Sequence, residues 1–116
     1  MSANSEILGP EKVIDKAGSL ERLGGDEDLY KEVCEIFVTD SKNNIERLKT
    51  VLSNKDQEDS TRRLHSLKGA AANIGGVKLS RIAGELEILA REGKLLEIED
   101  KYEVLKESLE ELLEEL

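Results

Sequence analysis

The chain has 116 residues, enough for one domain with a single hydrophobic core. Hydrophobic residues make up 38% and charged residues 37%, whereas aromatic residues make up only 3%, and there is one proline. This composition favours an all-α fold and is not that of a disordered chain. The formal net charge of −9 argues against nucleic acid or an anionic membrane surface as a partner, because both are polyanions.

Cys34 is the only cysteine, so the sequence offers no disulfide framework and no multi-cysteine metal site, which fits a reducing cytoplasm. The first residues, M-S-A-N-S-E, lack the basic region and apolar run of a secretory signal, and no apolar run is long enough to cross a bilayer. We therefore expect a cytoplasmic protein without membrane contact, and we expect a monomer.

The N-terminal part of the chain predicts a flexible lead-in over residues 1–9 and one domain over residues 10–116. Pro10 suits the first turn of a short helix, where its missing N–H costs nothing. The Gly24–Gly25 pair is the expected end of that helix. Its apolar side chains are Val13, Ile14, Ala17, Leu20 and Leu23.

A second helix is predicted from about residue 28 to 52, with Asp26 as its N-cap. Its apolar residues point in two directions about 110° apart. We expect the first half of this helix to receive the N-terminal helix as well and its second half to belong to the main bundle. The first set is Leu29, Val33 and Ile36, and the second is Phe37, Ile45, Leu48 and Leu52.

Three more amphipathic helices follow, one from the N-cap Asp56 to Gly75-Gly76, one over about 78–92 with Gly93 as its cap, and one over about 98–116. Short links make consecutive helices antiparallel, so we expect an up-down-up-down four-helix bundle with a short additional N-terminal helix. The apolar positions of the last two helices are Leu79, Ile82, Leu86, Leu89, Ile98, Tyr102, Leu105, Leu109, Leu112 and Leu116.

The segment from Thr61 to Gly76, T-R-R-L-H-S-L-K-G-A-A-A-N-I-G-G, contains the only histidine, His65. In a helix, His65 lies about 140° from the centre of the apolar stripe, with Lys68 and Gly69 on the same exposed side. An exposed glycine in the middle of a helix lowers the stability of the helix by about 1 kcal/mol relative to alanine, which suggests that Gly69 has another role. Because glycine has no side chain, the surface at Gly69 gives another protein access to the imidazole. The apolar stripe is Ser60, Leu64, Leu67, Ala71 and Ile74.

A neutral imidazole is nucleophilic at one ring nitrogen, and it exchanges its proton near neutral pH. A phosphoryl group on that nitrogen adds negative charge, which Lys68 is placed to neutralise. Arg62, one turn earlier, and Ala72, one turn beyond Gly69, are candidate docking residues that flank this surface.

The elements H-S-L-K-G, A-A-A-N-I-G-G and L-x-x-I-A-x-x-L-E together resemble the signature of histidine-containing phosphotransfer (HPt) domains. The upstream L-x-R-L-G-G-D-E-D-L-Y and Phe37 resemble the usual beginning of that family. The resemblance covers the chain from about Leu20 to Gly93. One departure is Leu64, because the residue before the histidine is often alanine in the family; we expect it to alter core packing and not chemistry.

The resemblance implies that His65 accepts a phosphoryl group from the aspartyl phosphate of a response-regulator receiver domain and passes it to an aspartate on another. Lys68 would stabilise the phosphorylated state, and Gly69 would give the receiver access. The expected partners are receiver domains and a hybrid histidine kinase. The family has no kinase activity of its own, and no cofactor is expected in this chain, since Mg²⁺ would belong to the receiver.

Four alternatives remain open from the sequence. A metal site has too few soft ligands, although acidic clusters could bind Ca²⁺ weakly. A Cys34–His65 nucleophile pair requires the two side chains to meet in the bundle. The third is a helical adaptor bundle in which His65 is inert. The fourth is a phosphotransfer module that a histidine kinase phosphorylates directly, as in the chemotaxis kinases.

Overall fold

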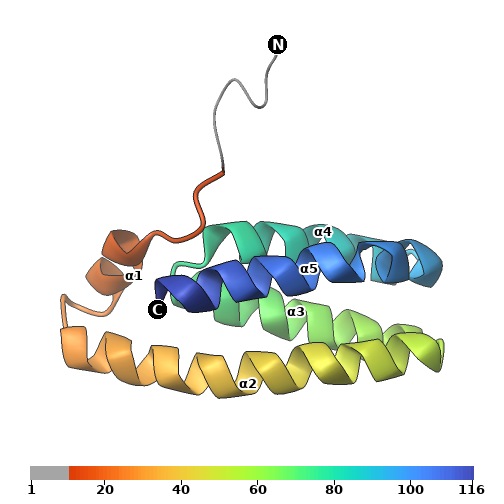
Figure 1. Cartoon of the computed structure of the whole chain (residues 1–116), viewed down its shortest axis with the longest axis horizontal. Coiled ribbons are helices and arrows are strands. Elements are labelled where there is room, and N and C mark those ends of the chain that lie inside the picture. The colour runs from red at the N-terminus through yellow and green to blue at the C-terminus, as the bar shows by residue number, and fades with distance from the viewer. Residues whose placement is uncertain (1–10) are drawn as a thin grey trace, which may run out of the picture.

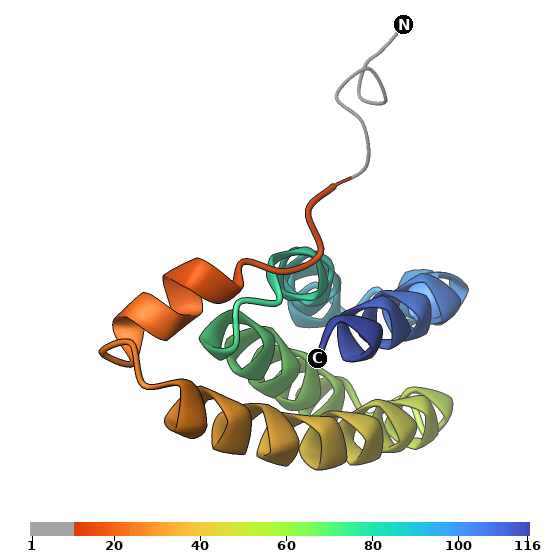
Figure 2. The same ribbon diagram turned by 60° about the vertical axis from the view of Figure 1, so that its left-hand side comes forward.

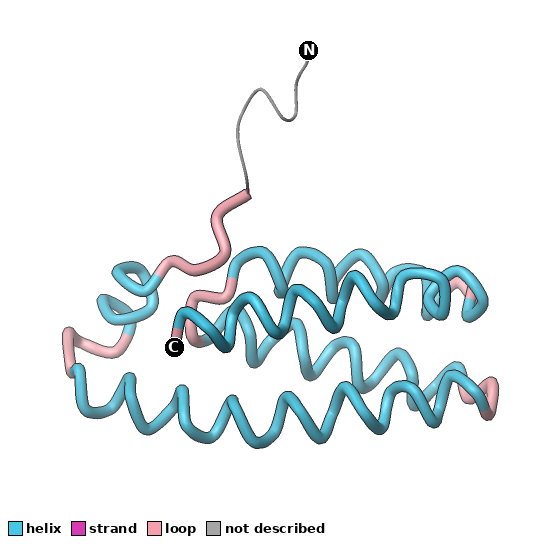
Figure 3. The backbone as a smooth tube through the Cα atoms, in the orientation of Figure 1, coloured by secondary structure: helices cyan, strands magenta, loops and turns pink. Residues whose placement is uncertain are grey.

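The computed structural model describes residues 11–116, and within them it contains five helices and no strand. The helices α2 to α5 run alternately up and down as a four-helix bundle (Figures 1 and 2). Around the bundle each helix packs on the next, and α2 also packs on α5. The links are short (Figure 3). The helices are α1 (Lys16–Arg22), α2 (Glu27–Ser53), α3 (Gln57–Asn73), α4 (Val77–Arg91) and α5 (Leu95–Glu115).

The all-α class and the antiparallel four-helix bundle are therefore confirmed. Two predicted N-caps are also confirmed, because Asp26 accepts a hydrogen bond from the backbone N–H of Leu29 and Asp56 accepts one from that of Asp59, both at 3.0 Å. The predicted lead-in and Pro10 lie outside the described residues. The last helix begins three residues earlier than predicted, because Gly93, at φ 77°, reverses the chain directly after α4.

The first helix begins later than predicted, at Lys16, so Val13 and Ile14 precede it. Asp15 explains this start. Its carboxylate accepts a hydrogen bond from the N–H of Gly18 at 3.1 Å, and its own N–H donates to the carbonyl of Gly75 at 2.7 Å. Because this N–H is bonded across the molecule, the chain enters the helix only after Asp15.

The first half of α2 receives α1, as predicted, because Lys16 pairs with Glu27 at 3.4 Å and lies 5.5 Å from the ring centroid of Tyr30. The apolar set of this half does not form the contact, since Ile36 is 62% exposed and Leu29 is 40% exposed. The helix α1 also lies across the end of the bundle, near the link between α3 and α4 (Figure 1), where the Ser19 hydroxyl donates to the carbonyl of Asn73 at 2.6 Å. This bond and that of Asp15 hold α1 at the end of the bundle, beside the start of α2.

The buried side chains are those of the apolar stripes predicted for the bundle helices, with few exceptions. All five residues of the α3 stripe are buried, including Leu64, and so is the second apolar set of α2. Leu116 is an exception, because it is exposed at the C-terminal end of α5, and Leu89 is only partly buried. Tyr102 is also partly buried, and its hydroxyl donates to the carbonyl of Ile45 at 2.8 Å, which joins α5 to α2.

Gly75 provides a test of how tightly the N-terminal segment is held. It adopts φ +83°, and a Cβ there would lie 2.3 Å from the backbone oxygen of Asp15. We expect Gly75→Ala to lower the free energy of unfolding by about 2 kcal/mol or more, measured by urea denaturation, because it adds left-handed backbone strain to a backbone clash. Gly24→Ala is the matched control, since Gly24 has φ +72° but open space around it. Equal losses in the two variants would contradict the close contact.

Candidate functional site

His65 lies in the middle of α3 on the side opposite the buried stripe, as the helical spacing predicts. Its side chain is 64% exposed. Leu64 and Leu67, its neighbours on the stripe, are fully or almost fully buried. The packing of α3 therefore fixes the backbone from which His65 projects, while the ring itself remains open to solvent.

A buried carboxylate on α4 lies directly beneath the imidazole. The side chain of Glu87 is only 4% exposed, and it contacts three nitrogen groups from two helices. Its Oε2 lies 3.0 Å from Nδ1 of His65 and 2.5 Å from Nη2 of Arg91, and its Oε1 lies 3.3 Å from Nζ of Lys68. Because a buried charge without partners is strongly destabilising, these contacts allow the carboxylate to remain ionised.

The ionisation of Glu87 results from two opposing effects. Burial alone would raise the pKa of this carboxyl, but the hydrogen bonds from Arg91, Lys68 and His65 outweigh burial and hold the pKa below its usual value. Glu87 is therefore an acceptor only. It follows that Nδ1 of His65 carries the proton in this contact, and in the neutral ring the lone pair resides on Nε2.

Lys68 is positioned by α4 as well as by its own helix. Its backbone carbonyl accepts a hydrogen bond from the Ser80 hydroxyl at 3.1 Å. Its aliphatic stem passes over Gly84, where a Cβ would lie 3.1 Å from Cδ of Lys68. The glycine in α4 thus makes room for the lysine to reach Glu87.

Gly69 is open, as predicted, because a Cβ added there would meet nothing within 4 Å. Together with Ala72 it lines a hollow between α3 and α4 that Arg81 of α4 and Arg22 of α1 also border. Arg22 donates to the carbonyl of Ala72 at 2.9 Å. The surface next to Gly69 is therefore small in side-chain volume and is bordered by two arginines and by Asp15.

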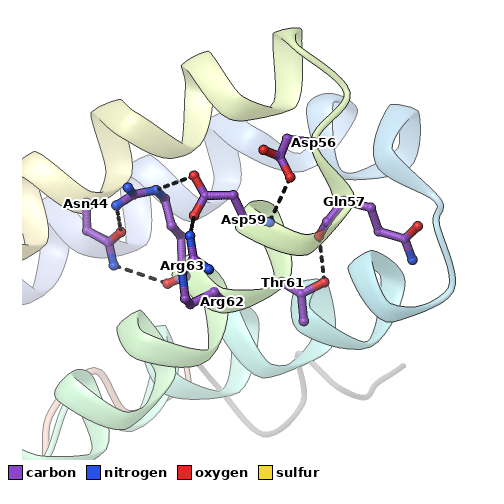
Figure 4. Close-up of polar contacts among 7 residues, drawn as sticks. All are labelled: Asn44, Asp56, Gln57, Asp59, Thr61, Arg62 and Arg63. Atoms are coloured by element: carbon purple, nitrogen blue, oxygen red, sulfur yellow. Dashed lines mark hydrogen bonds and ion pairs between the residues drawn. The ribbon is translucent and has the colours of Figure 1, made fainter.

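Arg62 is exposed near the beginning of α3, where it pairs with Asp59 (Figure 4). It also lines a hollow beside His65, together with Arg91. The adjacent Arg63 has a different role, because its Nη1 donates to Oδ1 of Asn44 at 3.2 Å while Nδ2 of Asn44 donates to its carbonyl at 3.1 Å. This reciprocal pair joins α3 to α2.

Cys34 is buried far from His65. It packs near Tyr30, whose hydroxyl donates to the carbonyl of Ile74 at the end of α3, and burial raises the pKa of the Cys34 thiol. Asn44, which contacts Arg63, is ten residues or about 15 Å further along α2. The Cys34–His65 pair considered from the sequence is therefore excluded by the fold. Among residues 11–116, no three His, Cys, Asp or Glu side chains lie close enough together to hold a metal ion.

Comparison with protein families agrees with this geometry. The sequence model of the family described as Hpt domain matches residues 32–115, which is most of the chain. The chain belongs to the Hpt domain family. No curated protein and no solved structure shows a significant match to it. Hpt domains are phosphotransfer modules of two-component signalling and are not kinases. Within the described part of this Hpt domain, no helix is long and apolar enough to cross a membrane.

Sequence reasoning about this Hpt domain gave no role to Glu87 or Arg91, although Glu87 is the last letter of the L-x-x-I-A-x-x-L-E element. A signal for it exists. At 100° per residue Glu87 lies about 40° from Ala83, which is on the buried side of α4. Because a buried carboxylate rarely lacks a charged partner, the position of Glu87 in the sequence already indicates that cationic side chains lie next to it.

The lowered pKa of Glu87 predicts a pH dependence of stability for this Hpt domain. A carboxyl whose pKa is lower in the folded state contributes stability above its unfolded pKa, near 4.3, and loses it as the pH falls through the folded pKa. We therefore expect wild type to lose more stability than Glu87→Gln between pH 6 and pH 3, in urea denaturation at a series of pH values. Glu99→Gln, on an exposed position of α5, is the control. Parallel curves for wild type and Glu87→Gln would contradict the ion cluster.

Proposed function

We propose that this Hpt domain is a phosphorelay intermediate and that His65 is its phosphorylated residue. The observation that carries the proposal is the placement of an exposed imidazole whose Nδ1 lies against an ionised, buried carboxylate, beside the open surface at Gly69. A carboxylate in this position orients the ring and leaves Nε2 as the nucleophilic nitrogen.

In the first step, the lone pair on Nε2 of His65 attacks the phosphorus of an aspartyl phosphate on a receiver domain. The bond from phosphorus to the aspartate oxygen breaks, and the aspartate leaves as a carboxylate. The ring becomes an N-phosphorylated imidazolium that keeps its proton on Nδ1, and Glu87 stabilises that positive charge. In the second step, an aspartate oxygen of another response regulator attacks the phosphorus, and the N–P electron pair returns to Nε2.

The surrounding residues support docking of a receiver. Receivers carry the acidic pocket and the Mg²⁺ for this reaction, so a basic surface on the partner is favourable. Basic side chains gather on this face although the whole chain has a net charge of −9, and four of them are paired there with carboxylates. We assign phosphoryl stabilisation to Lys68, steric access to Gly69, and docking contacts to Arg62 and Ala72. The basic residues that border the face are Arg22, Arg62, Lys68, Arg81 and Arg91.

We also propose that residues 10–116 act as one domain, although the family match begins at residue 32. The bonds from Asp15, Ser19 and Arg22 to residues 72–75 support this, since they join α1 to the end of α3. The expected phosphodonor is the receiver domain of a hybrid histidine kinase, and the acceptor is the receiver of a response regulator.

The proposal predicts phosphoryl uptake from a phosphorylated receiver domain in the presence of Mg²⁺. An acid-labile, base-stable phosphate is expected on the wild-type protein and is expected to be lost in His65→Gln, measured by radiolabel transfer and by mass spectrometry. Both proteins should show the same helical circular dichroism, because the ring is exposed. Transfer to a second receiver should then remove the label.

Two other results would distinguish the alternatives. Label that arrives from a histidine kinase lacking any receiver domain would indicate direct phosphorylation by the kinase. If none of a panel of receivers and kinases transfers label to the protein, the alternative function, a helical adaptor with an inert His65, is supported instead.

Gly69 provides a second test. We expect Gly69→Ala to raise the free energy of unfolding by up to about 1 kcal/mol, because alanine is the better helix former and the added methyl group meets open space. The same methyl group should slow transfer from a receiver by about tenfold, as expected for 1–2 kcal/mol of overpacking in the complex. Phosphorylation by the small donor phosphoramidate should not change. An unchanged rate with receivers would remove Gly69 from the docking surface.

A further inference from the structure

Lys68 is already occupied in the unphosphorylated protein. Its Nζ lies 3.3 Å from Oε1 of Glu87, a carboxylate that is almost completely buried. If Lys68 is to bind a phosphoryl group on His65, it must loosen this contact. Removal of the cationic partner from a buried carboxylate is strongly unfavourable unless other donors remain. The phosphotransfer role of Lys68 therefore requires something else to hold Glu87.

Arg91 provides the other donor. Its Nη2 lies 2.5 Å from Oε2 of Glu87, the oxygen that Lys68 does not contact. Arg91 follows Glu87 by four residues on α4, which places the two side chains on adjacent turns of one helix face. It also lies in the last turn of α4, where a cation interacts favourably with the helix dipole.

The position of Arg91 is fixed by the bundle. The side-chain amide of Gln57, the first residue of α3, donates to the carbonyls of Ala90 and Arg91 at 3.0 and 3.2 Å. These bonds hold the end of α4 against the start of α3. Arg91 itself is 61% exposed and shares a hollow with His65, so it contributes little to the core. Its main interaction among the described residues is with Glu87.

We propose that Arg91 is a positioning residue that keeps Glu87 ionised and in place, so that Lys68 moves from Glu87 to the phosphoryl group when His65 is phosphorylated. This inference rests on the proposed function. No covalent bond or proton changes in this step; one ion pair is exchanged for another. Before phosphorylation Glu87 has Lys68 and Arg91 as cationic partners, and afterwards it has Arg91 and the Nδ1–H of the phosphorylated imidazolium.

The charges on both helices are compatible with this exchange. From α3, the groups beside His65 are Glu58, Arg62 and Lys68, and from α4 they are Glu87 and Arg91. A phosphoryl group adds nearly two negative charges to this cluster. Lys68 lies farther from Glu87, at 3.3 Å, than Arg91 does, at 2.5 Å, and it has a flexible stem and follows His65 by three residues, so Lys68 is the partner that moves.

A double-mutant cycle tests the exchange without any partner protein. Wild type, Lys68→Ala, Arg91→Met and the double variant are phosphorylated with phosphoramidate, and the half-life of the phosphohistidine is measured at neutral pH. In wild type, Lys68→Ala should shorten the half-life by about threefold to tenfold. In the Arg91→Met background, Lys68→Ala should change the half-life less than about twofold, because there Lys68 remains with Glu87. Arg91→Lys should restore most of the Lys68 effect.

The outcomes separate the inference from the proposed function. Equal effects of Lys68→Ala in the two backgrounds would overturn the inference, since an arginine that only adds positive charge acts additively. No effect of Lys68→Ala in wild type would also overturn it, while His65 would remain the phosphorylated residue. No phosphohistidine at His65 in wild type would refute the proposed function and the inference together. Lys101→Met, at an exposed position of α5 outside the site, is the control and should leave the half-life unchanged.

Discussion

The buried carboxylate of Glu87 is the interaction on which the candidate site depends. One side chain of α4 contacts the imidazole and the lysine of α3 and an arginine of its own helix. Although the three partners are themselves partly exposed, the buried carboxylate depends on them, because burial removes the solvent that would otherwise hydrogen-bond to it. The orientation of His65, the location of Lys68 and the ionisation of Glu87 are thus determined together.

The bundle provides the two conditions that this cluster needs. The packed stripe of α3 and the close contact between α3 and α4 fix the distance from His65 to Glu87. Two glycines then leave space where side chains would interfere, Gly84 for the stem of Lys68 and Gly69 on the open surface. Gly69 lowers the helix propensity of α3 and leaves the surface beside His65 open.

Much of this arrangement was predictable from the sequence, because helical periodicity and capping are local properties. The stripe around Leu64, the caps Asp26 and Asp56, and the exposure of His65 all follow from spacing. The course of residues 11–23 and the partners of Glu87 were not predicted. Both depend on contacts between segments far apart in the chain: Asp15 with Gly75, and Glu87 with His65 and Lys68. Periodicity says which side of a helix is buried, but not which residue of another helix it meets.

The reciprocal pair of Asn44 and Arg63 has an evolutionary consequence. It fixes the axial register of α2 against α3, as Figure 4 shows for Asn44 and Arg63. The cluster around Glu87, in contrast, is built from α3 and α4. Substitutions on the outward side of α2, where Leu29 and Ile36 are exposed, therefore alter neither the imidazole nor its carboxylate. The sequence of this outer side of α2 can therefore change in evolution independently of the imidazole and the carboxylate.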